Sequence, residues 1–305
     1  MKREIKNYFA SVHRQLQNKA KETDRPFNEL LQYYAAERFL YRFSQSKHKD
    51  KVILKGAMMF IVWKAPYARV TRDIDMLGRL HNSMENVMTM VKDVCKIEYP
   101  SDGIVFTAET VQVEQIMEEN DYKGARVSFT GLLGNARIPM QIDLGFGDVI
   151  FPEPENIDYP TLLNMPSPTL KGYPRETVIA EKFHTMMNKG IINSRMKDYY
   201  DIWLLSSQFD FDGVTLQQAI EKTFKYRGAV PASPTKLFDE ISLDKDKNIQ
   251  WSAFIRKSGL DTAPKDIKDV IKFIKDFLLP IMEDIIAEKI CGLTWKAAGP
   301  WKKIR

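Results

Sequence analysis

Thr71-Arg72-Asp73-Ile74-Asp75 is the most informative segment of this chain. It predicts a strand in which Asp73 and Asp75 share one face, because successive strand residues point to opposite sides. Two neighbouring carboxylates repel each other, and a shared hard cation relieves the repulsion. Mg²⁺ held by carboxylates while it binds nucleotide phosphates is a common arrangement in phosphoryl and nucleotidyl transfer. An exposed acidic strand edge has the same pattern, so the pair alone leaves both interpretations open.

A glycine turn upstream favours the metal and nucleotide interpretation. Residues 51–54 predict a short apolar strand, Gly56 predicts a turn, and residues 58–63 predict a buried helix. Backbone N–H groups and the positive end of a helix dipole at such a turn suit a phosphate. A tight turn into a core helix is the alternative. The order of the parts, in which a loop with Pro66 then leads to the acidic strand, favours phosphate binding.

A third carboxylate fits the same plan. The segment from Ile138 to Leu144 alternates as a strand, with Gln141 and Asp143 on its polar face. If this strand pairs beside the acidic one, Asp143 completes a cluster of three carboxylates, as in a two-metal site. An ordinary position on a polar face explains Asp143 equally well.

A lysine and two aspartates lie on two predicted helices farther along the chain. The first helix follows Pro174 and ends at Gly190, and Lys182 lies beside its buried stripe, where the ammonium can meet a phosphate. A surface lysine paired with a nearby acid is the alternative. On the second helix Asp198 and Asp201 are three residues apart and therefore share a face.

With these segments, the chain resembles the AbiEii/AbiGii-type nucleotidyltransferases, which are toxins of prokaryotic toxin–antitoxin and phage-defence systems. The set of segments is specific, although each one alone is weak. In the family's order, the matching segments are Leu54-Lys55-Gly56-Ala57, Thr71-Arg72-Asp73-Ile74-Asp75, Gln141-Ile142-Asp143, Ala180-Glu181-Lys182 and Arg195-Met196-Lys197-Asp198-Tyr199-Tyr200-Asp201.

The resemblance and the residue pattern indicate the same fold class. The family belongs to the DNA polymerase β-like nucleotidyltransferase superfamily, which implies an α/β (α+β) fold with a mixed-sheet core. We expect residues 1–160 to form the nucleotidyltransferase domain with N-terminal helices, and residues 161–305 to form a helical C-terminal domain that completes the active site. Prolines predict an extended linker over 151–174, and a helix over 264–277 that ends or kinks at Pro280.

By motif, the resemblance implies a role for each matched position. Asp73, Asp75 and Asp143 hold Mg²⁺, and Lys182 and Asp198 complete the catalytic set. The implied nucleotide-binding residues are Lys55, Gly56, Thr71, Arg72, Arg195 and Asp201. Two alternatives stay open: Asp201 in place of Asp198 as the catalytic aspartate, and a salt bridge from Arg195 to Asp198 in place of a phosphate contact.

The implied reaction moves a nucleoside monophosphate from an NTP to an acceptor, whose hydroxyl Asp143 positions or deprotonates. In several family members the acceptor is the 3′ end of tRNA, so the resemblance implies tRNA here and a cognate antitoxin protein as a possible partner. Ala57 stands where many superfamily members have a hydroxyl residue. The alternative is therefore a catalytically silent protein that keeps the fold and binds RNA or an antitoxin.

The composition is compatible with this function. At 305 residues, 28% charged and 44% hydrophobic, the chain has the make-up of an ordinary globular protein, and its net charge of +5 suits a nucleotide or RNA partner without requiring one. Cys95 and Cys291 form no Cys-x-x-Cys motif, which argues against zinc and favours a reducing cytoplasm. The sequence contains no signal-peptide core and no apolar run of about 20 residues, so we expect a cytoplasmic protein outside the membrane.

Overall fold

The structure divides into two compact units, and each is described by itself. The computed structural model describes residues 7–65, 69–117 and 123–303, so Pro66 of the predicted loop lies outside the described residues. Unit 1 contains the described residues of Met1–Val62, Thr71–Gly147 and Glu155–Gly172, and unit 2 contains those of Trp63–Val70, Asp148–Pro154 and Tyr173–Arg305. The division at residue 160 stays a prediction.

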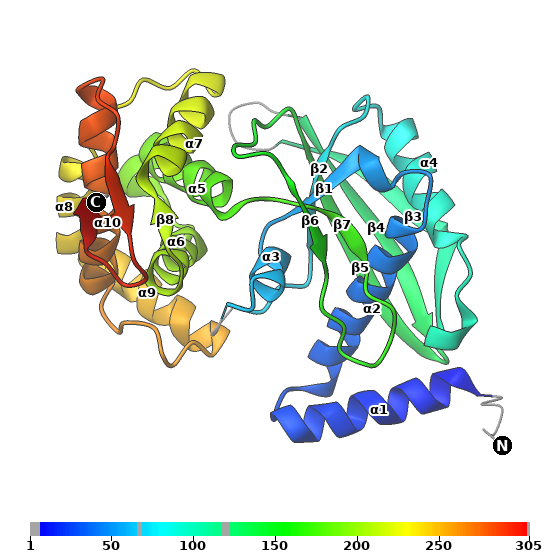
Figure 1. Ribbon diagram of the computed structural model, residues 1–305. Helices are drawn as coiled ribbons and strands as arrows, with labels where there is room; N and C mark the ends of the chain where they lie inside the picture. Colours follow the sequence, from blue (N-terminus) through cyan, green and yellow to red (C-terminus); the bar gives the residue numbers. More distant parts are fainter. Residues whose placement is uncertain (1–6, 66–68, 118–122, 304–305) are drawn as a thin grey trace. The chain divides into compact units, whose positions relative to one another are not determined.

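Unit 1 is built on a mixed sheet (Figure 1). Its strands are β1 (Val52–Lys55), β2 (Ile74–Gly78), β3 (Ile104–Met117), β4 (Lys123–Leu133), β5 (Ala136–Phe146), β6 (Glu155–Asp158) and β7 (Thr169–Gly172). They lie in the order β3-β4-β5-β2-β1-β7-β6. Strands β2 and β5 pair in parallel, as do β1 and β7, and the other neighbours are antiparallel. The predicted mixed α/β fold class is confirmed.

One face of this sheet is apolar and packs against helices. The helices of unit 1 are α1 (Tyr8–Thr23), α2 (Phe27–Ser44), α3 (Met58–Val62) and α4 (Met84–Cys95), with short 3-10 turns at Lys49–Lys51 and Pro100–Asp102. Ile74 and Ile142 are fully buried, and the Phe39 ring of α2 lies 4.9 Å from the Phe129 ring of β4. Helix α4 contacts β3 and α2. Because strand side chains alternate, Asp75 of β2 and Asp143 of β5 belong to the opposite face.

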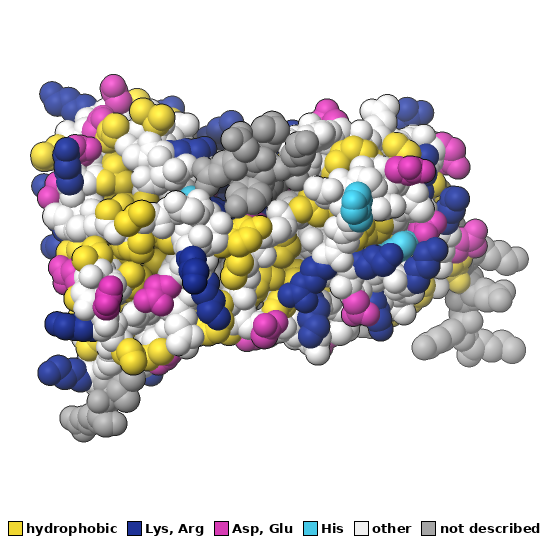
Figure 2. Space-filling model, turned by 90° about the horizontal axis from the view of Figure 1, so that it is seen from above, with side chains coloured by type: hydrophobic (Ala, Val, Ile, Leu, Met, Phe, Trp, Pro, Cys, Tyr) yellow, Lys and Arg dark blue, Asp and Glu magenta, His cyan; other side chains and the backbone are white. Residues whose placement is uncertain are grey.

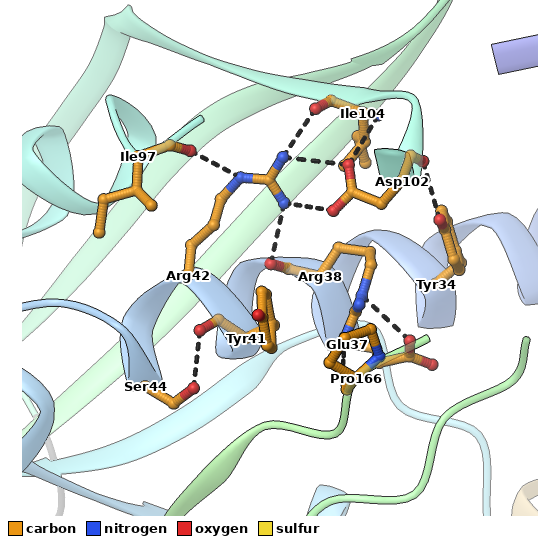
Figure 3. A network of polar contacts seen from close by, with 10 residues as sticks. All are labelled: Tyr34, Glu37, Arg38, Tyr41, Arg42, Ser44, Ile97, Asp102, Ile104 and Pro166. Atoms are coloured by element: carbon orange, nitrogen blue, oxygen red, sulfur yellow. Dashed lines mark hydrogen bonds and ion pairs between the residues drawn. The ribbon is translucent and has the colours of Figure 1, made fainter. Parts of the chain in front are cut away.

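A buried ion pair ties α2 to the start of β3 (Figure 3). The Arg42 Nη1 donates to Asp102 Oδ2 at 2.6 Å, and Nη2 donates to Oδ1 at 3.1 Å. The same guanidinium donates to the carbonyl oxygens of Ile97 and Ile104, at 2.9 Å each. Arg42 is 2% exposed and Asp102 is 0% exposed, so the low local dielectric makes each of these contacts costly to break.

Glu37, also on α2, makes the stability of the protein depend on pH. Burial raises its pKa to about 7, against the opposing effects of Arg38 and of the Leu162 N–H group. The folded protein therefore keeps a proton on Glu37 over a range in which the unfolded chain, with a pKa near 4.5, has lost it. We expect the free energy of unfolding to fall by about 3 kcal/mol between pH 4.5 and pH 7. Urea denaturation of Glu37→Gln should lack this fall, and an unchanged pH slope would contradict the expectation.

Unit 2 is mainly helical. Its elements are α5 (Arg175–Lys189), a 3-10 turn at Gly190–Ile192, α6 (Met196–Gln208), β8 (Phe211–Asp212), α7 (Gly213–Tyr226), α8 (Thr235–Leu243), α9 (Lys245–Ser258), α10 (Ile267–Ile286), β9 (Leu293–Trp295) and β10 (Trp301–Lys303). Helix α10 contacts α6, α7, α8 and α9, and the three strands form a small sheet in the order β10-β9-β8. Among the described residues, no helix is both long enough and apolar enough to cross a membrane.

Of the expectations about prolines, the linker over 151–174 is wrong, and so is the alternative in which the helix ends at Pro280. The expected linker over 151–174 contains strands β6 and β7, which fit between its prolines and add to the edge of the sheet. Pro280 lies inside α10, which continues to Ile286. Ile281 and Met282 are fully buried just after it, and this burial offsets the cost of about 3 kcal/mol for a proline within a helix.

Candidate active site

Four charged residues form a row across four adjacent strands of unit 1. The register pairs Lys55 with Asp75, Asp75 with Asp143, and Asp143 with Arg126. Directly paired residues point to the same face of a sheet and lie about 5 Å apart. We call these four residues the carboxylate row. Its two carboxylates are neighbours at the centre, and a cation stands at each end.

The Asp143 carboxylate is held by two side chains. Arg126 donates from Nε to Oδ1 at 2.9 Å and from Nη2 to Oδ2 at 2.8 Å. Gln141 donates its amide to the same two oxygens, at 3.2 and 3.3 Å. The hydrogen bond to Asp143 raises the pKa of Arg126, so the guanidinium stays charged. Asp143 thus lies beside Asp75, as expected if the two strands pair. It also binds Arg126, which was not predicted from the sequence.

The glycine turn lies against the other carboxylate of the row. Gly56 has a φ of +71°, and a Cβ at this position would come within 2.6 Å of the Asp75 Cγ. Glycine is therefore required both for the backbone conformation and for the close approach of Asp75. Helix α3, which follows, has five residues, so few peptide dipoles are aligned behind the turn. A phosphate at this turn would depend on the backbone N–H groups more than on the helix dipole.

Three more predicted residues surround the start of β2. Asp73 directly precedes the strand, is partly exposed, and is close enough to Arg126 to contribute to the raised pKa of that guanidinium. Thr71 donates its amide to the Tyr33 hydroxyl at 3.1 Å and its own hydroxyl to the Asp73 carbonyl at 3.4 Å. Arg72 is exposed. These contacts hold the backbone that carries Asp73.

The chemistry of the carboxylate donors fits a hard divalent cation. Asp73, Asp75 and Asp143 offer only carboxylate oxygens, which Mg²⁺ prefers, and the last two are direct neighbours. In the part of the chain that the structure describes, no three Asp, Glu, His or Cys side chains are close enough together to hold a metal ion. Asp143 is bound instead to Arg126, so the ligand set stays a prediction.

Unit 2 contains a second group of charged side chains, around Lys182 of α5. Its Nζ lies 2.8 Å from Asp198 Oδ1 and 2.8 Å from Asp201 Oδ2, both on α6. The three side chains are 15%, 5% and 1% exposed, respectively. Burial alone would lower the pKa of Lys182, but the two carboxylates outweigh it and raise the pKa. Lys182 is therefore a charged lysine with a buried stem, not a solvated surface residue.

Arg69 binds Asp201 from the other side. Its Nε donates to Oδ1 at 3.0 Å, and its Nη2 donates to Oδ2 at 3.1 Å. Burial by itself would raise the pKa of Asp201, but Arg69 and Lys182 outweigh it and lower the pKa. Asp201 is therefore ionised, and cations bind both of its oxygens.

Arg195 and Lys197 add two cations beside the same carboxylates. The Arg195 Nε lies 3.6 Å from Asp198 Oδ2, which is the salt bridge considered as an alternative, and the arginine side chain is 39% exposed. The pKa of Lys197 is lowered by burial and by Lys182, Arg195 and Arg69. We call these four cations, with Asp198 and Asp201, the cationic cluster. When all are ionised it has an excess of two positive charges, so it attracts an anion.

Comparison with family models identifies the chain. The model of the family described as "Nucleotidyl transferase AbiEii toxin, Type IV TA system" matches residues 38–273, which is well over half of the sequence. The chain belongs to the AbiEii family. The match includes the carboxylate row and the cationic cluster, and the resemblance inferred from the short motifs is confirmed.

Two solved structures are similar to this AbiEii family member. JHP933 from Helicobacter pylori is 12% identical, with coverage of 83% of this chain and 89% of that chain and a TM-score of 0.42. A candidate nucleotidyltransferase from H. pylori is 14% identical, with coverage of 83% and 92% and a TM-score of 0.40. No curated protein matches the chain. At these values, the likeness to the solved structures supports no assignment of residues.

Three cations of this AbiEii protein did not emerge from sequence reasoning. Arg126 lies on β4, where Ala125 and Val127 are buried, so the alternation does place it on the polar face of the sheet. Lys197 lies within the recognised Arg195-to-Asp201 motif and was not singled out. For Arg69 there was no signal, because it lies between elements, where no periodicity applies.

Proposed function

We propose that this AbiEii protein is a Mg²⁺-dependent nucleotidyltransferase that transfers a nucleoside monophosphate from an NTP to the 3′ end of tRNA. The acceptor hydroxyl oxygen forms a bond to the α-phosphorus, and the bond from that phosphorus to the bridging oxygen breaks. Pyrophosphate leaves with that oxygen, and the hydroxyl proton passes to a base. As the toxin of a toxin–antitoxin or phage-defence system, the protein would act in the cytoplasm and have a cognate antitoxin.

The observation that supports this proposal best is the in-register pair Asp75 and Asp143 beside a turn that requires glycine. Lys55 and Arg126 stand at the two ends of the row and not between its carboxylates, so a divalent cation that arrives with a substrate phosphate could still join Asp75 and Asp143. On the face shown in Figure 2, Lys and Arg side chains are interspersed with Asp and Glu. The described side chains of that face form no extended field of one sign, so recognition of a phosphate is expected to depend on local groups of cations.

In unit 1 the proposed roles follow from the donor atoms. Asp73, Asp75 and Asp143 would hold Mg²⁺, and a bound Mg²⁺ would supply charge neutralisation and polarisation at the phosphates of the NTP. Asp143 also orients or deprotonates the acceptor hydroxyl once Arg126 releases it. The nucleotide is held by residues of the turn and of the segment before β2, namely Lys55, Gly56, Thr71 and Arg72.

In unit 2 the proposed roles follow from charge. Lys182 and Arg195 contact phosphate oxygens and stabilise the charge that develops on the leaving pyrophosphate. Asp198 is the proposed catalytic aspartate because its Oδ2 faces Arg195 only at 3.6 Å, whereas both oxygens of Asp201 are within 3.1 Å of cations. We therefore expect Asp198→Asn to lower activity more than Asp201→Asn does.

A lysine variant tests the phosphate contact. Lys182→Met should lower kcat/KM for the NTP about a hundredfold, as expected for the loss of one donor to the transition state. It should also lower the free energy of unfolding by about 1–3 kcal/mol, because Asp198 stays buried without its closest cation. Lys225→Met, at an exposed lysine of α7 in the same unit, is the control for both measurements. Unchanged kinetics in Lys182→Met would leave only a structural role for this lysine.

The reaction itself is tested by incubating the protein with each labelled NTP, Mg²⁺ and total tRNA. Label on the 3′ end of tRNA, with release of pyrophosphate, is the expected result. A wild-type protein that binds tRNA but transfers no label from any of the four NTPs would favour the silent binder.

Growth of cells separates the same two alternatives. Expression of the wild-type chain alone should slow bacterial growth, and Asp73→Ala should restore it at equal protein levels. A silent RNA binder would stay toxic as Asp73→Ala, because the loss of a carboxylate makes a surface more attractive to phosphate. Toxicity that persists in the variant would thus oppose a catalytic function.

A further inference from the structure

The Asp201 carboxylate has the contacts of a structural charge and not those of a reacting group. The Arg69 guanidinium donates to both of its oxygens, at 3.0 and 3.1 Å, and the Lys182 Nζ lies 2.8 Å from Oδ2. Its side chain is 1% exposed, and that of Arg69 is 14% exposed. Asp143 is 17% exposed and its arginine partner 37% exposed, so Asp201, with three contacts from cations and 1% exposure, is the less accessible of the two carboxylates to a substrate proton or a metal ion.

The charges around Lys182 nearly balance, and Arg69 is one of them. The Lys182 ammonium lies between two carboxylates, Asp198 and Asp201, both at 2.8 Å. These three groups alone carry one net negative charge, which would repel a phosphate. Arg69 brings the group to neutrality, and Arg195 and Lys197 then make the surroundings positive.

We propose that Arg69 is a positioning residue for nucleotide binding, which acts by neutralising Asp201 so that Lys182 can bind phosphate. This inference rests on the proposed function of Lys182. It makes Asp201 a fixed partner of Arg69 and not a catalytic residue. A residue between two secondary-structure elements, outside every recognised motif, thereby controls the charge of the cationic cluster.

If Arg69 acts through its charge, a second substitution at Asp201 should restore the phosphate binding that is lost when Arg69 is replaced. A purely structural role of Arg69 predicts no such recovery. Arg69→Gln should leave Asp201 free to compete for Lys182 and should weaken binding of an oligophosphate about tenfold. Adding Asp201→Asn to Arg69→Gln removes the competing charge, so affinity should return to within about threefold of wild type. If the contact between Arg69 and Asp201 only stabilised the fold, adding Asp201→Asn would leave oligophosphate binding as weak as in Arg69→Gln, or weaker.

The experiment is calorimetric titration of the full chain with inorganic tripolyphosphate, beside the label-transfer assay. Arg69→Lys loses the bidentate contact but keeps the positive charge, so a role through charge predicts tripolyphosphate binding within about threefold of wild type. The control is Arg227→Gln, because Arg227 also forms a buried pair in unit 2, with Asp148 at 3.1 Å, and is 11% exposed. Its affinity should equal that of wild type.

The outcomes separate this inference from the proposed function. Tenfold weaker binding in Arg69→Gln, with recovery in Arg69→Gln/Asp201→Asn, supports the positioning role. Wild-type affinity in Arg69→Gln, or no recovery in the double variant, overturns it while label transfer by the wild type still stands. If the wild type binds no tripolyphosphate and transfers no label, the role of Lys182 fails and both proposals fall together.

Discussion

Asp75→Asn is expected to abolish label transfer while the protein stays folded. Asp75 is one of the two inner members of the carboxylate row and pairs with Lys55 on one side and with Asp143 on the other. Its removal takes away a metal ligand next to the phosphate turn, and the loss of several kcal/mol of charge stabilisation corresponds to about a thousandfold in rate. The Tm should stay equal or rise slightly, because the repulsion from Asp143 is relieved.

The same result is expected for Asp73→Ala, with transfer measured from labelled NTP and folding measured by circular dichroism. Glu114→Gln is the matched control, because Glu114 is an exposed residue of β3 that pairs with Arg126 but lies outside the carboxylate row. It should keep the activity of the wild type. Full transfer by either aspartate variant would remove the metal assignment, and a large fall in Tm would mean that the lost activity reflects misfolding.

The sequence was sufficient to predict which face of its own strand or helix a candidate site residue occupies. The alternation in residues 138–144 was enough to place Asp143 on a polar face, and the three-residue spacing placed Asp198 and Asp201 on one side of a helix. Both follow from the geometry of a single element. The prediction that Asp143 meets Asp75 needed a further assumption, that the two strands pair, and the register of β2 and β5 bears it out.

The contacts that escaped prediction are those that depend on register or on loops. The bidentate contact from Arg126 to Asp143 depends on the register in which β4 pairs with β5. A single sequence does not determine the register of two strands, so this contact could not be predicted. The fork from Arg69 to Asp201 joins residues 132 positions apart, from a segment without periodicity. Strand β6 was missed because prolines on both sides suggested a linker, although they do not interrupt its four residues.

Asp102→Ala is expected to destabilise unit 1 by about 3–5 kcal/mol, because it leaves the Arg42 guanidinium buried without its counter-charge. The carboxylate also accepts the Ile104 N–H at 3.1 Å, so a backbone donor at the start of β3 is lost as well. Glu22→Ala, which removes an acid of α1 that is 64% exposed and paired with Lys19, is the control and should cost about 1 kcal/mol at most.

The double variant Arg42→Met/Asp102→Ala shows whether the cost comes from the unpaired charge. It should be less destabilised than Asp102→Ala alone, because no buried charge is left without a partner. Urea unfolding followed by far-ultraviolet circular dichroism measures all four proteins. The five tryptophans, Trp63, Trp203, Trp251, Trp295 and Trp301, all belong to unit 2, so their fluorescence follows that unit separately. A circular-dichroism transition in Asp102→Ala that stays within 1 kcal/mol of wild type would show that this ion pair does not hold α2 to β3.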